Sequence, residues 1–356
     1  MKSVVIVGAG VVGLFCAVRL AQSGARVTVL EAEKEDLSVY GPGASAAAAG
    51  MLAPLGEASS PYDALAFASY DLWKAWHSGA EWEDGVRFDG GAVIAANAEE
   101  ARAQIERAAS LGRSAEALST SQLRKRTGLR SKLEHVVFVV DEGVADPLRV
   151  LSGLMMRARA HGVIVEHNRE VASVSATTAT CYEDDAVYEA DAIVLACGYW
   201  GCKRLMEFAP ALAHVTAAKG HLAPVKLDQP LWPNFRAPGF YIAQRREDVV
   251  LGATLEPGRS DRRVEQGRVD ELLAAANQLL PGELTPAGRG WAGIRPMSPD
   301  GWPMIGPSGE VLVAAGHSRN GWLMAPITAE IVSAYVFGAE IPPEWAALSP
   351  QRFETP

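Results

Sequence analysis

The sequence predicts an α/β fold in which a Rossmann-like domain is interleaved with an α+β domain built on an antiparallel sheet. Three continuous apolar runs are typical of parallel strands buried on both faces, and they lie at residues 4–7, 192–196 and 311–315. Shorter strands with alternating polarity occur between these runs. Two interleaved domains fit this order better than two consecutive ones. We expect the first domain to comprise 1–80, 145–218 and 289–356, and the second 81–144 and 219–288.

The amino end has the pattern of a nucleotide-binding βαβ unit. A β-branched strand at 4–7 runs into Gly8-Ala-Gly-Val-Val-Gly13, and apolar residues then recur at the spacing of one helix face up to Ser23. A second strand, 26–30, delivers Glu31 at about the 20-residue interval at which an acid meets a ribose hydroxyl. This order predicts a dinucleotide whose pyrophosphate lies at a helix N-terminus. An acid at position 31 argues against a 2′-phosphate.

The segment from Gly41 to Leu52 departs from this pattern, because it consists mainly of Gly, Ala and Ser. Small side chains let the backbone lie flat against a planar ligand, and their unhindered N–H groups can donate to phosphates or to a ring edge. A flexible linker explains the same composition. The residues leave both interpretations open, and we expect a loop in either case.

The middle of the chain carries clear start signals for two helices. Ser119 and Gln122 form a capping box, and Asp146-Pro147 places an acid at the cap of a helix that continues to Ala160. Another helix is expected at 99–111. Short strands are expected at 83–96, 163–166, 171–174, 179–182 and 186–188, the last three as a β-meander. A separate antiparallel sheet is expected from 219–225, 240–244 and 249–253, followed by a helix over 265–280.

Two arginines near the carboxyl end are expected to meet. Arg295 lies in Trp291-Ala-Gly-Ile-Arg-Pro296, and Arg319 lies in the turn 316–321, which precedes a helix from about Ala325 to Phe337. Planar guanidinium groups hold carboxylates bidentately and keep their charge at any working pH. Next to a dinucleotide signature, this pair predicts a flavin beside a site for a small carboxylate, as in an amine oxidase.

Other functions for these side chains remain open. Each arginine is equally compatible with a structural role, for example tying a loop to Asp300. His317, next to a glycine turn, fits a structural hydrogen bond better than a catalytic base. Tyr241, on a strand of the second sheet, is suited to donate its hydroxyl to a carboxylate or simply to pack.

Composition excludes several function classes. The chain has 356 residues, a net charge of −9 and 49% hydrophobic content, which indicate a soluble protein with more than one domain. An acidic chain has no electrostatic footprint for nucleic acid or an anionic membrane, and no apolar run reaches the ~20 residues of a membrane span. Neither a basic leader nor zinc-like cysteine spacing is present, so we expect a cytoplasmic protein without a metal site. The cysteines are Cys16, Cys181, Cys197 and Cys202.

Through these motifs the chain resembles the D-amino acid oxidase family of flavoproteins, and most closely its glycine oxidase branch linked to thiamin biosynthesis. Five ordered blocks carry the resemblance, at 8–13, 45–52, 252–258, 291–296 and 316–326. The resemblance implies a glutathione-reductase-type FAD-binding domain and a substrate-binding domain. It places FAD along Gly8, Gly10, Gly13, Glu31, Ser45, Gly50, Met51, Val171, Gly198, Arg319, Asn320, Gly321, Trp322 and Leu323. It assigns the substrate carboxylate to Arg295 with help from Tyr241, and makes Arg319 a second active-site arginine.

The implied reaction is oxidative deamination of glycine, sarcosine or a small D-amino acid. Hydride passes from the substrate α-carbon to flavin N5, molecular oxygen reoxidises the flavin to give hydrogen peroxide, and the imine hydrolyses to an oxo acid and ammonia or an amine. A dehydrogenase that passes electrons to a quinone or carrier is the alternative. A flavin-binding subunit without turnover is the third hypothesis, and the intact Arg295 and Tyr241 argue against it. A homo-oligomer is implied by analogy only.

The sequence departs from the family at three positions that we expect near the substrate. Trp322 replaces a smaller aliphatic residue, and Phe240 and Leu255 also differ. These changes leave the volume of the substrate site and the choice of substrate open. The attachment residues of covalent-flavin relatives, a histidine and a cysteine, are missing, so we expect non-covalent FAD.

Overall fold

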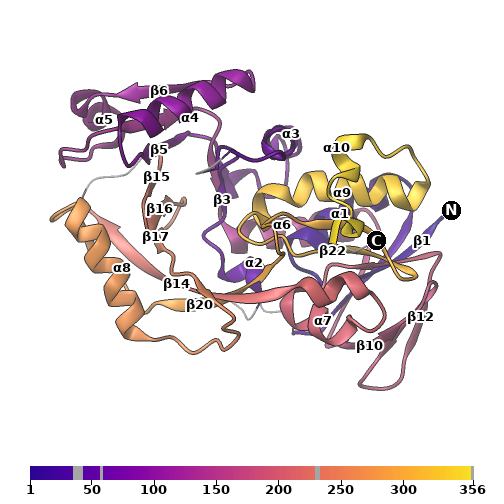
Figure 1. The fold of residues 1–356 in the computed structure, drawn as a ribbon. Helices are drawn as coiled ribbons and strands as arrows, with labels where there is room; N and C mark the ends of the chain where they lie inside the picture. Colours follow the sequence, from indigo (N-terminus) through magenta and orange to yellow (C-terminus); the bar gives the residue numbers. More distant parts are fainter. Residues whose placement is uncertain (35–42, 57–58, 229–232, 354–356) are drawn as a thin grey trace.

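A computed structural model describes residues 1–34, 43–56, 59–228 and 233–353, and two large sheets organise this part of the chain (Figure 1). The first has six strands in the order β21 (Met304–Ser308), β22 (Val311–Ala315), β13 (Ala192–Leu195), β1 (Ser3–Val7), β2 (Arg26–Glu31) and β9 (Ile164–His167). Neighbouring strands are parallel except at the β21–β22 edge. The three apolar runs of the sequence are therefore parallel strands of this sheet, as predicted, and the structure shows that they are neighbours.

The second large sheet is antiparallel apart from its β5–β15 pair. Its ten strands are β5 (Gly91–Ile94), β6 (Ala115–Leu118), β7 (Val136–Val139), β14 (Thr216–Leu227), β15 (Asn234–Ala237), β16 (Phe240–Gln244), β17 (Val249–Gly252), β18 (Glu256–Pro257), β19 (Leu284–Pro286) and β20 (Trp291–Met297). The long strand β14 pairs with β17, β18, β19 and β20. A parallel and an antiparallel sheet built from alternating segments confirm the predicted fold class, while the domain boundaries stay a prediction.

Two small sheets complete the strand inventory of the described residues. The predicted meander is confirmed as β10 (Val171–Val174), β11 (Thr178–Cys181) and β12 (Val187–Glu189), and a second sheet joins β3 (Met51–Leu52), β8 (Gly143–Ala145) and β4 (Val86–Arg87). The α-helices are α1 (Val11–Gln22), α2 (Ala44–Ala47), α3 (Asp63–His77), α4 (Ala98–Ser110), α5 (Thr120–Thr127), α6 (Pro147–Ala160), α7 (Gly198–Leu205), α8 (Gln266–Leu279), α9 (Gly321–Phe337) and α10 (Pro343–Ala346). Short 3-10 helices are η1 (Glu83–Gly85), η2 (Pro210–His214) and η3 (Pro350–Phe353).

The helix starts predicted from capping residues are confirmed. The Ser119 hydroxyl accepts a hydrogen bond from the Gln122 N–H, and the Gln122 side chain accepts one from the Ser119 N–H at 2.8 Å. Asp146 Oδ1 accepts from the N–H groups of Leu148 and Arg149 at the start of α6. These local signals work because each satisfies N–H groups that the first helical turn leaves unpaired.

Two expectations need correction, and one helix was missed. The small-residue loop is not continuous, because its described part contains the helix α2 and the strand β3; its residues 41 and 42 lie outside the described residues. Helix α3 was not predicted at all. Helix α9 begins at Gly321 and not near Ala325, so that Pro326 is inside it.

Contacts with α3 explain how α9 tolerates this proline. Pro326 has no N–H to donate to the carbonyl of Trp322, and the indole Nε1 of Trp73 on α3 donates to that oxygen at 2.9 Å instead. Ser69 on α3 donates its hydroxyl to the carbonyl of Leu323 at 2.6 Å. Trp73 thus supplies the one donor that the proline removes, and Ser69, which also accepts from the Ile327 N–H at 3.3 Å, bridges the next N–H and carbonyl of the helix.

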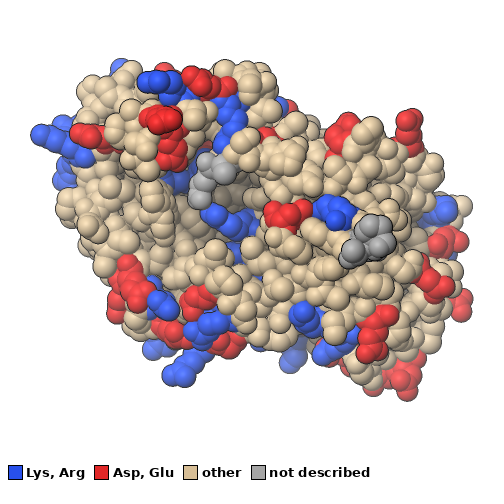
Figure 2. All heavy atoms as spheres, viewed as in Figure 1, with Lys and Arg blue, Asp and Glu red and all other residues tan. Residues whose placement is uncertain are grey.

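The parallel sheet is covered on both faces. Helices α1, α3, α6 and α9 form the larger apolar core on one face, while the meander and α7 pack on the other (Figure 1). Cys16, Cys181 and Cys202 are buried in these cores, and Cys197 is half-buried. Within the described ranges, no group of metal-ligating side chains and no helix able to span a membrane is found. Figure 2 shows acidic and basic side chains interspersed over one face, which is hollowed near its centre.

Candidate functional site

The glycine signature forms the turn between β1 and α1. Gly8 has a φ of +107°, and a Cβ atom there would lie 2.5 Å from the carbonyl oxygen of Ala196 at the end of β13. A Cβ atom on Gly13 would lie 1.9 Å from the carbonyl oxygen of Gly8. Glycine is therefore required at both positions for α1 to pack this closely against the sheet.

Glu31 lies at the end of β2, beside this turn. Its Oε2 accepts a hydrogen bond from the Ala9 N–H at 2.7 Å, and its Oε1 accepts one from the Glu33 N–H at 3.0 Å. The carboxylate is thereby fixed next to the first turn of α1. This is the position that the sequence pattern predicts for an acid that binds a ribose.

The short helix α2 lies on the start of α1. Ser45 accepts a hydrogen bond from the Val11 N–H at 3.0 Å, and a Cβ atom on Gly10 would approach the Ser45 hydroxyl to 3.1 Å. Gly50, with a φ of +80°, passes so close to β8 that a Cβ atom would lie 1.8 Å from the Ala145 carbonyl oxygen. The small residues of this segment therefore serve a close packing of backbone, which a flexible linker would not need.

Three helix N-termini gather at one edge of the parallel sheet. Strands β1, β13 and β22 are parallel neighbours, and they are followed by α1, α7 and α9. The N-cap residues of these helices are Gly10, Cys197 and Asn320, and none of them makes a side-chain capping hydrogen bond. Helix N-termini of this kind bind anions through free N–H groups and a partial positive charge. The edge therefore fits the pyrophosphate and the polar ring of a flavin dinucleotide.

The remaining predicted cofactor residues lie around this edge. Gly198 opens α7 with a φ of +62° and open space beside its Cα, and Val171 begins β10, which packs with α7 in one core. Met51 pairs with Val144 between β3 and β8. Leu323 is buried in the first turn of α9. The individual cofactor contacts of these residues stay predictions.

Tyr241 and Arg295 come together on the antiparallel sheet, where two glycines leave room for them. A Cβ atom on Gly252 would lie 2.5 Å from the Tyr241 hydroxyl oxygen, and one on Gly220 would lie 2.2 Å from Arg295 Nη1. Tyr241 on β16 is paired with Gly252 on β17. Each large polar side chain thus lies flat across a neighbouring strand.

Arg319 lies near this pair, as the sequence predicts. Burial raises the pKa of Tyr241, while the charges of Arg295 and Arg319 and a hydrogen bond with Arg295 act in the opposite direction. Burial lowers the pKa of Arg295, and the charge of Arg319 lowers it further. These mutual electrostatic effects place the three side chains near one another. Arg319 itself is exposed, at the end of a turn before α9 whose residues 316–318 are buried.

No carboxylate of the described residues forms an ion pair with Arg295. Its Nη1 donates to the carbonyl oxygen of Thr254 at 3.2 Å. Asp300, the alternative partner considered from the sequence, is instead bound by Arg352 at 2.8 Å. The Asp300 hypothesis is therefore wrong for Arg295, whose guanidinium is left without a carboxylate partner among the described residues.

Two further side chains have contacts that limit their possible roles. His317 is buried, its Nε2 lies 3.0 Å from the Thr328 hydroxyl, and burial lowers its pKa to about 3. This fits the structural role favoured from the sequence. The Trp322 indole donates to the Ser45 carbonyl at 3.1 Å and stacks on Trp73, so it lies between α2 and α3.

A polar cluster beside Arg295 was missed from the sequence. Lys219 and His221 on β14 are fully buried, although their alternation with small residues resembles the exposed face of a strand. Their partners lie in the segment 254–265, more than thirty positions away. The sequence carries no signal for pairing over such a separation.

Comparison with known proteins gives consistent relatives. The model of a family described as FAD dependent oxidoreductase matches residues 3–335. A glycine oxidase from Bacillus licheniformis is 30% identical over 355 residues, covering 96% of this chain and 94% of that protein. The crystal structure of glycine oxidase from Geobacillus kaustophilus is similar with a TM-score of 0.85 at 28% identity, covering 99% of each chain. L-proline dehydrogenase from P. horikoshii also reaches a TM-score of 0.85, at 19% identity, over 99% of this chain and 98% of that one, and this likeness shows the fold alone.

Proposed function

This chain belongs to the FAD dependent oxidoreductase (DAO) family, and from that premise we propose that it oxidises glycine, sarcosine or another small amino acid with oxygen as the electron acceptor. The full-length similarity to proteins named glycine oxidase supports the substrate class. The products would be an oxo acid, ammonia or an amine, and hydrogen peroxide. We also propose a cytoplasmic location, which the free thiols of the four cysteines support.

The observation that carries this proposal is the pairing of Arg295 with Tyr241. A guanidinium without a carboxylate partner in the part of the chain that the structure describes lies beside a phenol. Burial raises the pKa of this phenol, so it keeps its proton at neutral pH. Together they present donors that match the two oxygens of a substrate carboxylate. Binding the carboxylate at a fixed place also fixes the direction of the adjacent α-carbon.

When bound, FAD supplies the two-electron acceptor that takes a hydride from the substrate α-carbon. The chain would hold it through the first turns of α1, α7 and α9, with Glu31 at the ribose. No step requires a proton acceptor from the chain if the substrate amine enters neutral. His317 is not suited to that task, because its Nε2 is engaged by Thr328 in the core. We propose non-covalent binding of FAD.

The electron acceptor is the part of this proposal with a competing alternative. A dehydrogenase that passes electrons to a quinone or carrier would use the same carboxylate site, and the same fold occurs in a protein named L-proline dehydrogenase. The fold therefore does not decide between oxygen and another acceptor.

The test is peroxide release from purified, FAD-loaded protein, coupled to a peroxidase. Glycine, sarcosine, D-alanine, D-proline and larger D-amino acids are compared. Peroxide with glycine or sarcosine supports the proposal. Peroxide only with bulkier substrates would mean that the enzyme is an oxidase of another substrate class. If a substrate bleaches the flavin without oxygen but no peroxide is released in air, the protein is a dehydrogenase and not an oxidase. No bleaching with any substrate would overturn both.

A further inference from the structure

Strand β14 separates Arg295 from the buried polar cluster. Successive side chains of a strand point to opposite faces. The Arg295 guanidinium lies over Gly220, whereas Lys219 and His221 point to the other face. The segment 254–265, which follows β17, runs along the edge of β14 through the β18 pairing and contacts both faces.

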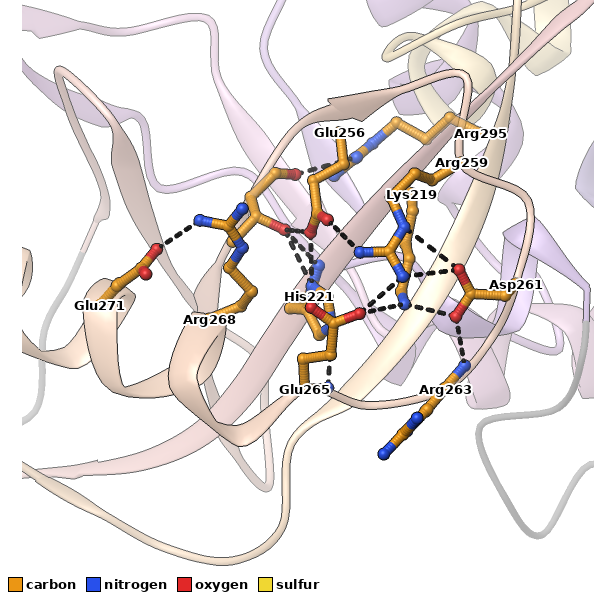
Figure 3. Close-up of polar contacts among 11 residues, drawn as sticks. Lys219, His221, Glu256, Arg259, Asp261, Arg263, Glu265, Arg268, Glu271 and Arg295 are labelled. Atoms are coloured by element: carbon orange, nitrogen blue, oxygen red, sulfur yellow. Dashed lines mark hydrogen bonds and ion pairs between the residues drawn. The ribbon is translucent and has the colours of Figure 1, made fainter.

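On the face away from Arg295, ion pairs hold this segment to the sheet (Figure 3). The fully buried ammonium group of Lys219 donates to Asp261 at 2.7 Å and lies 3.5 Å from Glu265. The Arg259 guanidinium bridges three carboxylates, those of Glu256, Asp261 and Glu265, at 2.6 to 2.9 Å. A buried ammonium group needs such partners because its desolvation is costly.

His221 binds the two ends of the segment at once. Its Nε2 accepts a hydrogen bond from the Glu265 N–H at 3.2 Å, so the ring proton must be on Nδ1. Nδ1 lies 3.1 Å from the Thr254 hydroxyl oxygen and 3.1 Å from Glu256 Oε1. The His221 N–H also donates to the Thr254 hydroxyl at 2.9 Å, and the Thr254 N–H donates to the His221 carbonyl at 3.3 Å. Only a neutral imidazole permits this arrangement.

Thr254 connects this arrangement to the proposed substrate site. Its hydroxyl and N–H bind His221 on one side, and its carbonyl oxygen accepts from Arg295 Nη1 on the other. We infer that His221 and Thr254 are positioning residues, which aim the Arg295 guanidinium at the substrate carboxylate through the Thr254 carbonyl. This inference rests on the proposed function, since it requires Arg295 to hold that carboxylate.

Burial, more than the surrounding charges, favours the neutral form of His221. Burial lowers its pKa first, and the ammonium group of Lys219 on β14 adds to this, while Glu256 on β18 and Glu265 before α8 act in the opposite direction. Protonation of Nε2 would set two donors, the ring N–H and the Glu265 N–H, against each other.

The test measures the Kd of acetate, a carboxylate without an amine, by the change it causes in the visible flavin spectrum of the FAD-loaded protein. His221→Ala is expected to raise this Kd about three- to tenfold, the equivalent of one lost hydrogen bond. His221→Gln is expected to restore most of the affinity, because its side-chain oxygen can accept from the Glu265 N–H. Arg268→Gln is the matched control: Arg268 pairs with Glu271 on the exposed side of α8, and its loss should change the Kd less than twofold.

A second variant covers the case in which His221→Ala does not fold. Thr254→Val has nearly the same shape but lacks the hydroxyl, and it should raise the acetate Kd in the same direction. Arg295→Ala separates the inference from the proposed function. If Arg295→Ala weakens acetate binding but His221→Ala and Thr254→Val leave it unchanged, the positioning role is overturned. If Arg295→Ala itself binds acetate normally, the proposed carboxylate site fails, and the inference fails with it.

Discussion

Two arginines on the same antiparallel sheet differ in what the chain provides for them. Arg236 on β15 binds both carboxylate oxygens of Glu142, with Nη2 to Oε2 at 2.8 Å, and also donates to the Leu55 carbonyl. Glu142 is completely buried. Arg295 on β20 has a backbone carbonyl and a phenol, but no carboxylate among the described residues.

This difference separates structural from functional charge. A bidentate pair such as Arg236 and Glu142 compensates both charges inside the protein, and its loss is felt as loss of stability. A guanidinium without a chain carboxylate keeps its fork for a ligand, and its loss should be felt in binding. The comparison predicts that removing the Arg236 side chain lowers stability, whereas removing the Arg295 side chain weakens substrate binding.

The largest effect is expected for Arg236→Leu. Without its partner, Glu142 is left as an uncompensated buried group, and burial already raises its pKa against the effect of Arg236. The free energy of unfolding should fall by about 3–5 kcal/mol, measured by urea denaturation of the FAD-loaded protein. Replacing Arg236 and Glu142 together by leucine should recover most of the loss. If the Arg236→Leu variant were as stable as the parent, Arg236 would have no structural role and the comparison with Arg295 would fail.

Arg295→Ala should change binding more than stability. Loss of a charge-assisted bidentate pair is expected to raise the substrate KM by at least about tenfold, measured by initial rates with the best substrate of the peroxide assay. Arg295→Lys should also be poor, because a point charge does not replace the planar fork. An unchanged KM for a carboxylate substrate would contradict the assignment of Arg295.

Glu31→Ala tests a third situation, a carboxylate that is partly satisfied by the chain. Two N–H groups bind Glu31 in the protein, and a ribose hydroxyl would add a further hydrogen bond. The affinity for FAD should fall about three- to tenfold, measured by flavin fluorescence after dilution. Circular dichroism should show that the fold is preserved. Full retention of FAD would exclude the ribose role of Glu31, whose remaining role would be to stabilise the glycine turn through the Ala9 N–H.

What the sequence predicted well depends on local patterns. The order of strand, glycines, helix and acid at the amino end was sufficient for the βαβ unit. The FAD-dependent family, which is confirmed, was predicted from the resemblance of five blocks along the chain. Capping signals located α5 and α6 within a residue. Helix α3 had a usable signal that was overlooked, since Ala66, Tyr70 and Trp73 recur at helical spacing and are all buried.

What the sequence did not predict depends on partners far away in the chain. The early start of α9 requires Trp73 to replace the missing donor of Pro326, and nothing near the proline indicates it. Arg236 and Glu142 are 94 positions apart, and His221 and Glu265 are 44 apart. Such pairings follow from sheet topology, which periodicity alone does not determine. The meeting of Arg295 and Arg319 was predicted from the residues, whereas the place of Tyr241 beside them was predicted only from the resemblance to a family.

The smallest expected effect concerns His317, a buried polar group two residues before Arg319 whose Nε2 lies 3.0 Å from the Thr328 hydroxyl. Burial lowers the pKa of His317 in the folded protein to about 3, below the ordinary value near 6.5. Between these two pH values, the unfolded chain therefore binds a proton at His317 that the folded chain does not bind. The contribution to stability is complete above pH 6.5 and is lost as the pH falls toward 3. By pH 6 the loss should be roughly 1 kcal/mol.

His317→Gln isolates this contribution from the other groups that titrate in acid. Glutamine places an amide near the Nε2 position, within reach of the Thr328 hydroxyl, but does not titrate. The parent should lose stability relative to this variant between pH 7 and pH 5, as measured by urea denaturation at saturating FAD. Parallel pH profiles would mean that the pKa of His317 is the same in the folded and the unfolded chain. In that case burial would not disfavour its charged form, and His317 would not count among the polar groups that the folded chain holds neutral in its interior.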